Sequence, residues 1–318
     1  MSRRGRQRGQ PSPSGILVID KPAKLTSFDV VRRVRARCDV RKAGHTGTLD
    51  PLATGVLPIC LNEATKIAGL LLAEDKRYRA ELSLGLRTDT YDITGQVLEA
   101  REAEAAQVTE AKVEAALVGL RGEVQQRPPA FSAVHKGGKR AHELARAGEE
   151  VELPERAVTV HQLEIERFDA EARKVVLMIH CSKGTYVRSL IDDLGQLLGC
   201  GATMSALRRL QSGSFTLDQA STLDALADIE RERWPLITLD EALSHLPFVD
   251  LPSAEDARSI GQGRGLDTST LGLGALAVGD ELRVRFAGQV VALGAVRAGK
   301  LAPHRVFAAC LEEALARS

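Results

Sequence analysis

Alternating apolar and polar residues mark the stretches of the chain that we expect to form strands. In 76–86 every second residue from Tyr78 to Leu86 is apolar or aromatic, the period of a strand that buries one face. Residues 15–20 (GILVID) form a nearly continuous apolar run, which predicts a buried strand that ends at Lys21-Pro22. We expect further strands over 157–168 and 173–181, and a strand with a turn over 203–215.

Apolar residues recur at helical spacing in other stretches. In 185–198 one face carries the residues that should point into the core, Val187, Leu190, Ile191, Leu194 and Leu197 or Leu198. A helix through about Val40 can be capped by Thr26 or Ser27, with Asp29 in its first turn. Its apolar face would carry Phe28, Val31, Val34 and Cys38. We expect further helices over 63–73, 99–121 and 139–147.

The C-terminal part of the chain has a different pattern. Composition shifts near 231–247, which we interpret as a connection between domains. Beyond it the chain is Gly-rich with short alternating segments, which is typical of a small β-barrel. We expect an α+β protein with a disordered basic tail over 1–13, a large domain over 14–245 and a small β-barrel domain over 246–318.

Composition excludes several classes of protein. Apolar residues make up 44% of the chain and charged residues 27%, yet no apolar run has the ~18–20 residues of a membrane span. The N-terminus has no apolar segment of a secretory signal. The five cysteines are scattered without a C-x-x-C pair, and the histidines lack metal-ligand spacing. We therefore expect free thiols in the cytoplasm, with no metal site and no membrane association.

Charge is distributed unevenly although the net charge is only +1. Residues 1–42 carry 12 Lys and Arg against 3 Asp and Glu, a balance of +9, which leaves 31 against 39, or −8, for the remainder. Such a basic region on an acidic body indicates a surface that faces phosphate groups. A solvated helix face with a basic tail would give the same count.

The run GHTGTLDPLATGVLP over 44–58 places one carboxylate, Asp50, among Gly, Thr and Pro residues. Gly47 and Gly55 permit backbone conformations and close approaches that a Cβ would prevent. Pro51 restricts its own φ and the conformation of the residue before it. The sequence therefore predicts a stiff loop that holds one acid beside a substrate, although an ordinary turn would have a similar local composition.

In the order of its residues, this run resembles the active-site motif of the TruB family of pseudouridine synthases, whose catalytic aspartate falls at Asp50. The C-terminal part resembles a PUA-type RNA-binding barrel. Further segments resemble the family's other motifs, namely GILVIDKPAKLTSFDVV (15–31), KRYRAELSLGLRTDTYDITG (76–95), SKGTYVRSLIDDLG (182–195) and ALRRLQSG (206–213).

The resemblance implies a pseudouridine synthase fold, a mixed and mostly antiparallel sheet flanked by helices and loops, followed by the PUA-like domain. It implies an enzyme that isomerises uridine to pseudouridine at position 55 in the TΨC arm of tRNA, without cofactor or metal and acting alone as a monomer. The target base must leave its stack, and an aspartate can act on it as a nucleophile. Attack on uracil C6, attack on ribose C1′ and action as a base all stay open.

The resemblance also implies roles for several residues around Asp50. Tyr78 would stack on the uracil, Tyr186 and Leu207 would line its pocket, and each would otherwise be a core residue. Arg188 would pair with Asp50, or else form an ordinary salt bridge with Asp192. His45 would replace the flipped base, or act only as a structural hydrogen-bonding group.

Supporting roles are less defined. Lys21 and the basic cluster over 32–42 would contact phosphate or support the Asp50 loop, and Asp92 would position the base or a loop. Lys136 and Lys139 lie where the spacing departs from the family pattern, so they receive no role. An alternative function is a tRNA-binding or folding protein without chemistry, and a third is a synthase guided by RNA–protein partners. The short tail favours a synthase that acts alone.

Overall fold

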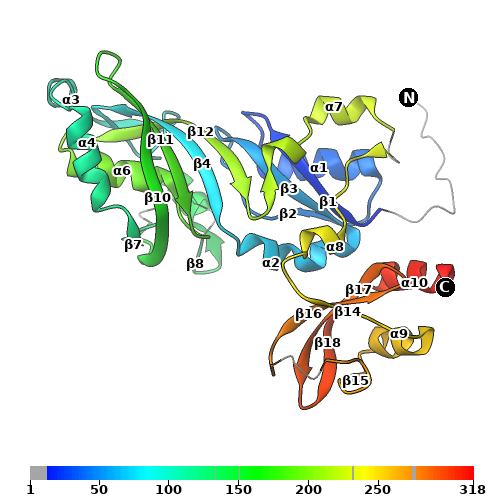
Figure 1. The fold of residues 1–318 in the computed structure, drawn as a ribbon. Coiled ribbons are helices and arrows are strands. Elements are labelled where there is room, and N and C mark those ends of the chain that lie inside the picture. The colour runs from blue at the N-terminus through cyan, green and yellow to red at the C-terminus, as the bar shows by residue number, and fades with distance from the viewer. Residues whose placement is uncertain (1–12, 133, 150, 231–232, 274–276) are drawn as a thin grey trace.

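Two sheets organise the chain, a nine-stranded sheet built before residue 217 and a five-stranded sheet built from the C-terminal residues (Figure 1). The computed structural model describes residues 13–132, 134–149, 151–230, 233–273 and 277–318. The predicted tail therefore lies outside the described residues except for Pro13. In the described part, no helix combines the length and the apolar character that crossing a membrane would require.

The large sheet is mixed and mostly antiparallel, which confirms the predicted α+β fold. Its strands follow the order β1-β3-β12-β4-β11-β10-β7, with β2 added beside β3 and β13 beside β12. The β3–β12 pair is parallel. The strands are β1 (Gly15–Lys21), β2 (Ala43–His45), β3 (Thr54–Leu61), β4 (Lys76–Leu84), β7 (Gly122–Gln126), β10 (Arg156–Asp169), β11 (Lys174–Cys181), β12 (Ala202–Ser212) and β13 (Phe215–Thr216).

Helices pack against this sheet, and α1 begins at the predicted cap. The Thr26 hydroxyl accepts from the Asp29 backbone N–H and the Asp29 carboxylate accepts from that of Thr26, a capping box. The helical elements are α1 (Ser27–Cys38), the 3₁₀-helix η1 (Asn62–Ile67), α2 (Ala68–Leu72), α3 (Glu102–Ala105), α4 (Glu110–Val118), α5 (Ala141–Arg146), α6 (Val187–Leu197), the 3₁₀-helix η2 (Leu217–Gln219), α7 (Leu223–Asp228) and α8 (Leu239–Ala242). Two short hairpins are formed by β5 (Leu86–Thr88) with β6 (Val97–Ala100), and by β8 (His135–Lys136) with β9 (Lys139–Arg140).

The alternation in β4 positions the main core. Tyr78, Ala80 and Leu82 are buried on one face, whereas Arg77 on the other face is exposed. The buried face joins apolar side chains of α1, α4 and α6 in one cluster. Because Tyr78 belongs to that cluster, the same face of the sheet carries both the core and one predicted site residue.

The C-terminal part confirms the predicted small β domain as an open five-stranded sheet. Its strand order is β14-β16-β17-β18-β15, and two helices pack on it. In the described chain, no strand of this sheet precedes Phe248, and the boundary predicted between 245 and 246 stays a proposal. The elements are β14 (Phe248–Asp250), α9 (Ala254–Gly261), β15 (Leu266–Asp267), β16 (Glu281–Phe286), β17 (Gln289–Arg297), β18 (Lys300–Val306) and α10 (Ala308–Arg317).

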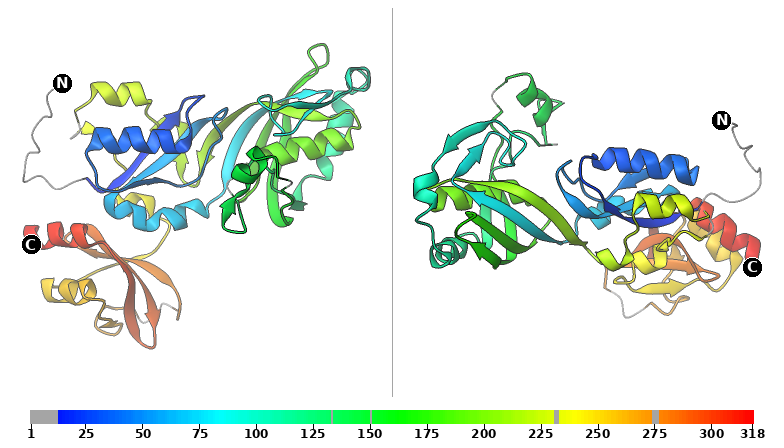
Figure 2. Two further views of the ribbon diagram at one scale, coloured as in Figure 1. Left: turned by 180° about the vertical axis from the view of Figure 1, so that it is seen from behind. Right: turned by 90° about the horizontal axis from the view of Figure 1, so that it is seen from above.

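The two sheets share an apolar cluster. Ile16 and Val18 of β1 are buried together with Leu293 of β17 and Phe307. The Lys66 ammonium also donates to the Val306 carbonyl over 2.7 Å. In Figure 2 the red and orange C-terminal elements accordingly lie beside the blue N-terminal part of the large domain. Because the C-terminal elements contact η1 and α8, their removal would expose part of this shared cluster to water.

Part of the predicted active-site loop is a strand. We predicted a loop over 44–58, but β3 begins at Thr54 and runs beside β1. Glycine and proline are poor strand formers, so Gly55 and Pro58 concealed it. Gly55 has φ +100, and a Cβ there would lie 2.1 Å from the Arg209 carbonyl oxygen. Glycine is therefore needed for the close approach of β3 to β12.

The helix predicted over 99–121 is wrong. Residues 97–100 form β6, which pairs with β5, and the chain then forms α3 and α4 separately. The Thr109 hydroxyl accepts from the Lys112 backbone N–H and thereby caps α4 in the middle of the predicted helix. An Ala-rich and acidic composition fits one long helix as well as two short ones, so it did not locate the break.

Two residues that we predicted to face the core are exposed in the structure. Phe28 on α1 is 65% exposed and Leu197 at the end of α6 is 60% exposed. Leu198, the alternative to Leu197, is partly buried against the main core. The other predicted core residues of these two helices, Val31, Val34, Cys38, Val187, Leu190, Ile191 and Leu194, are buried. Both exceptions lie in the first or last turn of their helices, where the side chain can turn away from the sheet.

Candidate active site

Asp50 lies in the loop between β2 and β3, which backbone contacts hold against α1. Ser27, the first residue of α1, donates from its hydroxyl to the Leu49 carbonyl and accepts from the Leu49 N–H over 2.8 Å. The Lys24 N–H donates to the Pro51 carbonyl over 2.8 Å. The residues on both sides of Asp50 are thus fixed, while its side chain remains 34% exposed.

Lys21 at the end of β1 supports this loop from below. Its side chain is fully buried, and its ammonium donates to the carbonyls of Ala53 (2.6 Å) and Pro22 (2.9 Å). Its pKa is lowered to about 8, mainly by burial, which Asp50 opposes and to which the Arg209 cation adds. Of the two roles open to Lys21, this placement favours support of the loop.

Arg188 in the first turn of α6 pairs with Asp50. Its Nε lies 2.9 Å from Asp50 Oδ2, at an angle that does not align as a hydrogen bond, and Nη2 donates to Asp50 Oδ1 over 3.3 Å. The guanidinium also donates to the carbonyls of Thr90 (2.8 Å) and Phe131 (2.9 Å). The alternative partner, Asp192, is bound instead by Arg87 through two hydrogen bonds.

Asp92 joins this pair from the other side. Its Oδ2 lies 3.7 Å from Arg188 Nη1, and its Oδ1 accepts from the backbone N–H and hydroxyl of Thr94. Its side chain is buried. Asp92 therefore orients the 88–95 loop, whose Thr90 carbonyl in turn binds Arg188.

Tyr78 and Leu207 come from neighbouring strands of the sheet. Tyr78 on β4 pairs with Arg209 on β12, and Leu207 pairs with Ala80. Both predicted side chains are buried in the same apolar cluster. Burial raises the pKa of the Tyr78 hydroxyl, and the nearby Arg209 cation opposes that shift.

Arg209 is a central residue that the sequence analysis missed. Its side chain is 1% exposed, and it donates to the carbonyls of Val56 (2.7 Å) and Gly47 (3.1 Å). It therefore ties the Asp50 loop and β3 to β12. On a strand, residues two apart share a face, so the predicted inward direction of Leu207 was the signal that could have identified it.

His45 and Tyr186 lie at the margins of this arrangement. His45 Nδ1 accepts from the Gly47 N–H over 3.3 Å, and burial together with the Arg209 cation lowers the His45 pKa. Tyr186 precedes α6, and the amide of buried Gln126 binds both its N–H and its carbonyl. The ring of Tyr186 faces the Arg156 guanidinium at 4.7 Å.

The fold thus brings Asp50, Arg188 and Asp92 into direct contact, and it groups Tyr78, His45 and Lys21 around Arg209. Tyr186, just before α6, contacts Gln126 and Arg156, and Leu207 on β12 lies in the apolar cluster with Tyr78. The cluster Arg32, Arg33, Arg35 and Arg37 is exposed on α1. Lys139 is exposed on β9, and the side chain of Lys136 lies outside the described part. The arrangement holds one accessible carboxylate against a guanidinium, which suits nucleophilic or base chemistry on a ligand above the loop.

Known proteins are similar to this chain over nearly its whole length. Residues 35–187 match the N-terminal domain of the TruB family of pseudouridylate synthases, and 188–245 match the C-terminal domain of tRNA pseudouridylate synthase B. The chain is 42% identical over 306 residues to tRNA pseudouridine synthase B of Chromohalobacter salexigens, covering 95% of this chain and 96% of that one. It is 43% identical over 317 residues to the enzyme of the same name from Yersinia enterocolitica, covering 95% and 93%.

Solved structures show the same fold. A chain of a Cbf5–Nop10–Gar1 complex is similar with a TM-score of 0.68 and 28% identity, over 93% of this chain and 86% of that one. A chain of an H/ACA ribonucleoprotein bound to a substrate RNA containing 2′-deoxyuridine is similar with a TM-score of 0.67 and 26% identity, over 92% and 84%. Both similarities extend over the two sheets and confirm the predicted pseudouridine synthase fold with its small C-terminal domain.

Proposed function

Because this chain belongs to the TruB family of pseudouridylate synthases, we propose that Asp50 is its catalytic carboxylate and that uridine 55 in the TΨC arm of tRNA is its target. The chain is an enzyme that converts uridine to pseudouridine in tRNA, as its relatives over nearly the full length are named. The observation that carries the residue assignment is the Asp50–Arg188 pair at 2.9 Å, with the carboxylate still one third exposed.

The reaction breaks the bond between ribose C1′ and uracil N1, turns the base, and joins C1′ to C5, which loses its hydrogen. Asp50 can attack C6 or C1′, or remove a proton after elimination, and each route needs an ionised carboxylate of fixed direction. Arg188 supplies the counter-charge and fixes the direction, because the Thr90 and Phe131 carbonyls hold its guanidinium in one orientation. Asp92 acts through Arg188 and the 88–95 loop.

The neighbouring side chains would form the pocket for the flipped base. Tyr78 offers an aromatic surface for the uracil, and Leu207 and Tyr186 are its walls. His45 at the start of the loop would occupy the space that the base leaves in the RNA. Lys21 has no free surface for phosphate, so its part is to keep the Asp50 loop rigid.

The exposed arginines of α1 and the C-terminal domain are proposed to bind the tRNA backbone. Phosphate contacts supply most of the affinity of such complexes, so binding should weaken strongly with salt. We further propose that the enzyme works in the cytoplasm as a monomer, without cofactor or metal in the chemical step. The related Cbf5 chains were solved in complexes with protein partners, whereas this chain would need none.

Tritium release tests the assignment. Unmodified tRNA labelled with ³H at uracil C5 should lose about one label per molecule with the wild type and none with Asp50→Asn, because forming the C1′–C5 bond expels that hydrogen. The matched control is Glu166→Gln, since Glu166 pairs with Arg79 Nε over 2.6 Å outside the site and its loss should leave release unchanged.

Affinity for tRNA separates this proposal from the alternative of a binding protein without chemistry. Asp50→Asn should bind tRNA within about tenfold of the wild type, because phosphate contacts remain. Wild-type release by Asp50→Asn would refute the catalytic role of Asp50. Tight binding with no release by the wild type alone would favour a tRNA-binding protein or a synthase that requires partners.

A further inference from the structure

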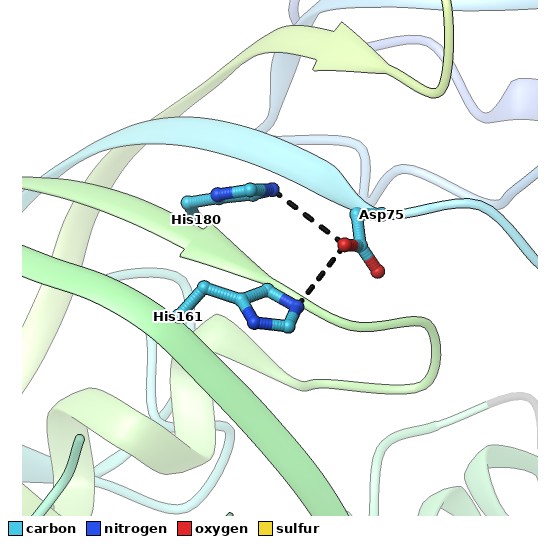
Figure 3. A group of neighbouring side chains, drawn as sticks. All are labelled: Asp75, His161 and His180. Carbon is cyan, nitrogen blue, oxygen red and sulfur yellow. Dashed lines mark ion pairs between the residues drawn. The ribbon is translucent and has the colours of Figure 1, made fainter. Parts of the chain in front are cut away.

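A second cluster of chemically active side chains lies away from the Asp50 loop. Asp75, His161 and His180 converge so that one ligand atom of each lies within 4.8 Å of the others (Figure 3). Asp75 Oδ2 is 3.0 Å from His161 Nε2 and 3.7 Å from His180 Nε2. We propose that these three residues bind a divalent zinc ion at the surface of the large sheet.

Strand register builds this cluster from three separate segments. His180 on β11 lies between Arg77 of β4 and Gln162 of β10 in the ladder. The β10 register shifts between Val160 and Gln162, so His161 is the extra residue of a bulge. A bulge redirects a side chain, and here the His161 ring comes to 4.8 Å from that of His180.

Asp75 approaches from the turn that precedes β4. Its backbone carbonyl accepts from the Gly213 N–H over 2.8 Å, which fixes the turn against the end of β12. In Figure 3 its carboxylate points toward both imidazole rings from this third segment. Two donors are therefore held by strands of the sheet, and the third by a turn that is hydrogen-bonded to the end of β12.

The donor atoms and their separations suit zinc. Zinc binds imidazole nitrogen and carboxylate oxygen at about 2.0–2.2 Å in tetrahedral sites, which places neighbouring ligand atoms about 3.3 Å apart. The two Asp75–histidine separations of 3.0 and 3.7 Å lie on either side of that value. The separation between the two histidine ligand atoms is within 4.8 Å, so side-chain rotations that bring the rings together would complete the geometry. Two imidazoles favour zinc over the oxygen-seeking Mg²⁺ and Ca²⁺, and three protein ligands leave one position for water.

The surrounding charges permit a cation. Asp75, His161 and His180 have 47%, 37% and 26% of their side chains exposed, so an ion can reach them. His161 also lines an open groove with Glu110, Glu114 and Glu164, and with Arg121, which pairs with Glu114. The groove therefore carries three acids against one cation.

Arg77, which faces the cluster from β4, and Lys76, which follows Asp75, are opposing charges; Arg77 donates to Gln162 Oε1 over 3.3 Å. Imidazole binds a metal ion in its neutral form.

The zinc would be structural, because the cluster and the catalytic residues occupy opposite faces of the sheet. His180 alternates with buried Ile179 and Cys181 on β11, as Arg77 alternates with buried Tyr78 on β4. A zinc ion on the outer face would clamp β4, β10 and β11 together without contact to Asp50. It should therefore raise stability and leave turnover unchanged.

Zinc binding by the full-length protein, purified without a polyhistidine tag and treated with chelator, tests the proposal. Equilibrium dialysis should give one tight Zn²⁺ per chain. Three variants, His161→Gln, His180→Gln and Asp75→Asn, should each weaken Zn²⁺ binding at least about tenfold. Loss of a residue that only hydrogen-bonds to a metal ligand already weakens metal binding by that much. The matched control is His304→Gln, because His304 pairs with Glu281 at the same 3.0 Å but outside this three-residue group.

Two further readouts separate a built site from adventitious binding. At a hundredfold excess over its dissociation constant, Zn²⁺ should raise the melting temperature of the wild type by about 5–10 °C and that of His161→Gln by much less. Tritium release should be equal with and without Zn²⁺, which keeps this test independent of the proposed function. Equal Zn²⁺ binding by the wild type and the three ligand variants would overturn the site and leave an ordinary histidine–carboxylate pair.

Discussion

Replacement of Arg188 by Met is the perturbation that most directly tests how the fold builds the active site. Methionine has a similar length and suits the helix, but it carries no charge and no N–H groups. The change leaves Asp50 and Asp92 without the cation between them, and it leaves the Thr90 and Phe131 carbonyls without their donor.

The contacts of Arg188 set the size of the effect on stability. Breaking a buried ion pair costs about 3–5 kcal/mol, and we take the lower part of that range because Asp50 is one third exposed and can be hydrated. At about 2–4 °C per kcal/mol for a domain of this size, the melting temperature should fall by about 6–12 °C. Turnover should fall at least about 10²-fold, because a carboxylate displaced by 1 Å can cost that much.

The assay is single-turnover tritium release, measured well below the melting temperature of each variant, with unfolding followed by circular dichroism. The matched control is Arg87→Met, because Arg87 forms a pair of similar geometry with buried Asp192 on the same helix, at 2.7 and 3.2 Å. That variant should lose comparable stability yet keep turnover within about threefold. Arg188→Lys should retain part of the stability but not the turnover, since an ammonium group cannot reproduce the fixed arrangement of N–H donors in the planar guanidinium.

Two results would refute this reasoning. Wild-type release by folded Arg188→Met would show that the pair with Asp50 has no part in turnover. An equal loss of turnover in Arg87→Met would show that any disturbance of α6 impairs the reaction, so the specific contact between Arg188 and Asp50 would no longer explain the effect.

Two further predictions concern the support of the Asp50 loop. The Lys21 pKa of about 8 lies below its unfolded value of about 10.5. Between pH 8 and pH 10.5 the Lys21 side chain is therefore more often protonated in the unfolded chain than in the folded one. The free energy of unfolding should therefore rise from pH 8 toward 10, and urea titrations of Lys21→Met should show a smaller rise. Gly55→Ala should lose about 2–4 kcal/mol because its Cβ would overlap the Arg209 carbonyl. In urea unfolding, the control Gly69→Ala should be neutral or stabilising, because its Cβ would have open space in α2.

Periodicity predicted the elements whose two faces differ in environment. The alternation over 76–86 identified β4, which exposes part of one face, and the helical spacing over 185–198 identified α6, whose second face is polar although most of it is buried. Periodicity failed where both faces are apolar or where the backbone conformation depends on contacts with distant residues. β3 is buried along nearly its whole length, so its sequence shows no alternation, and its glycine is required by a strand that lies far away in the sequence.

The residues around Asp50 divide in the same way. Asp50 and Arg188 could be named from local motifs, but their distance of 2.9 Å depends on how α6 packs. The metal-ligand rules search for histidines that are close along the chain, and Asp75, His161 and His180 meet only through the register of three strands. Spacing therefore predicted no metal site, whereas the fold assembles a candidate for one.

Buried cations exceed buried anions around the Asp50 loop. Lys21 and Arg209 are buried beneath it, and Arg209 contacts the Val56 and Gly47 carbonyls and the Tyr78 hydroxyl, none of which carries a full negative charge. Its charge contributes to lowering the pKa of Lys21, His45 and Lys76. Backbone carbonyls carry only partial charges, so the site retains a positive field that would be repulsive in an apolar core. The phosphate groups of a bound RNA would supply the missing negative charge, and the same cations that stiffen the loop would then attract the substrate.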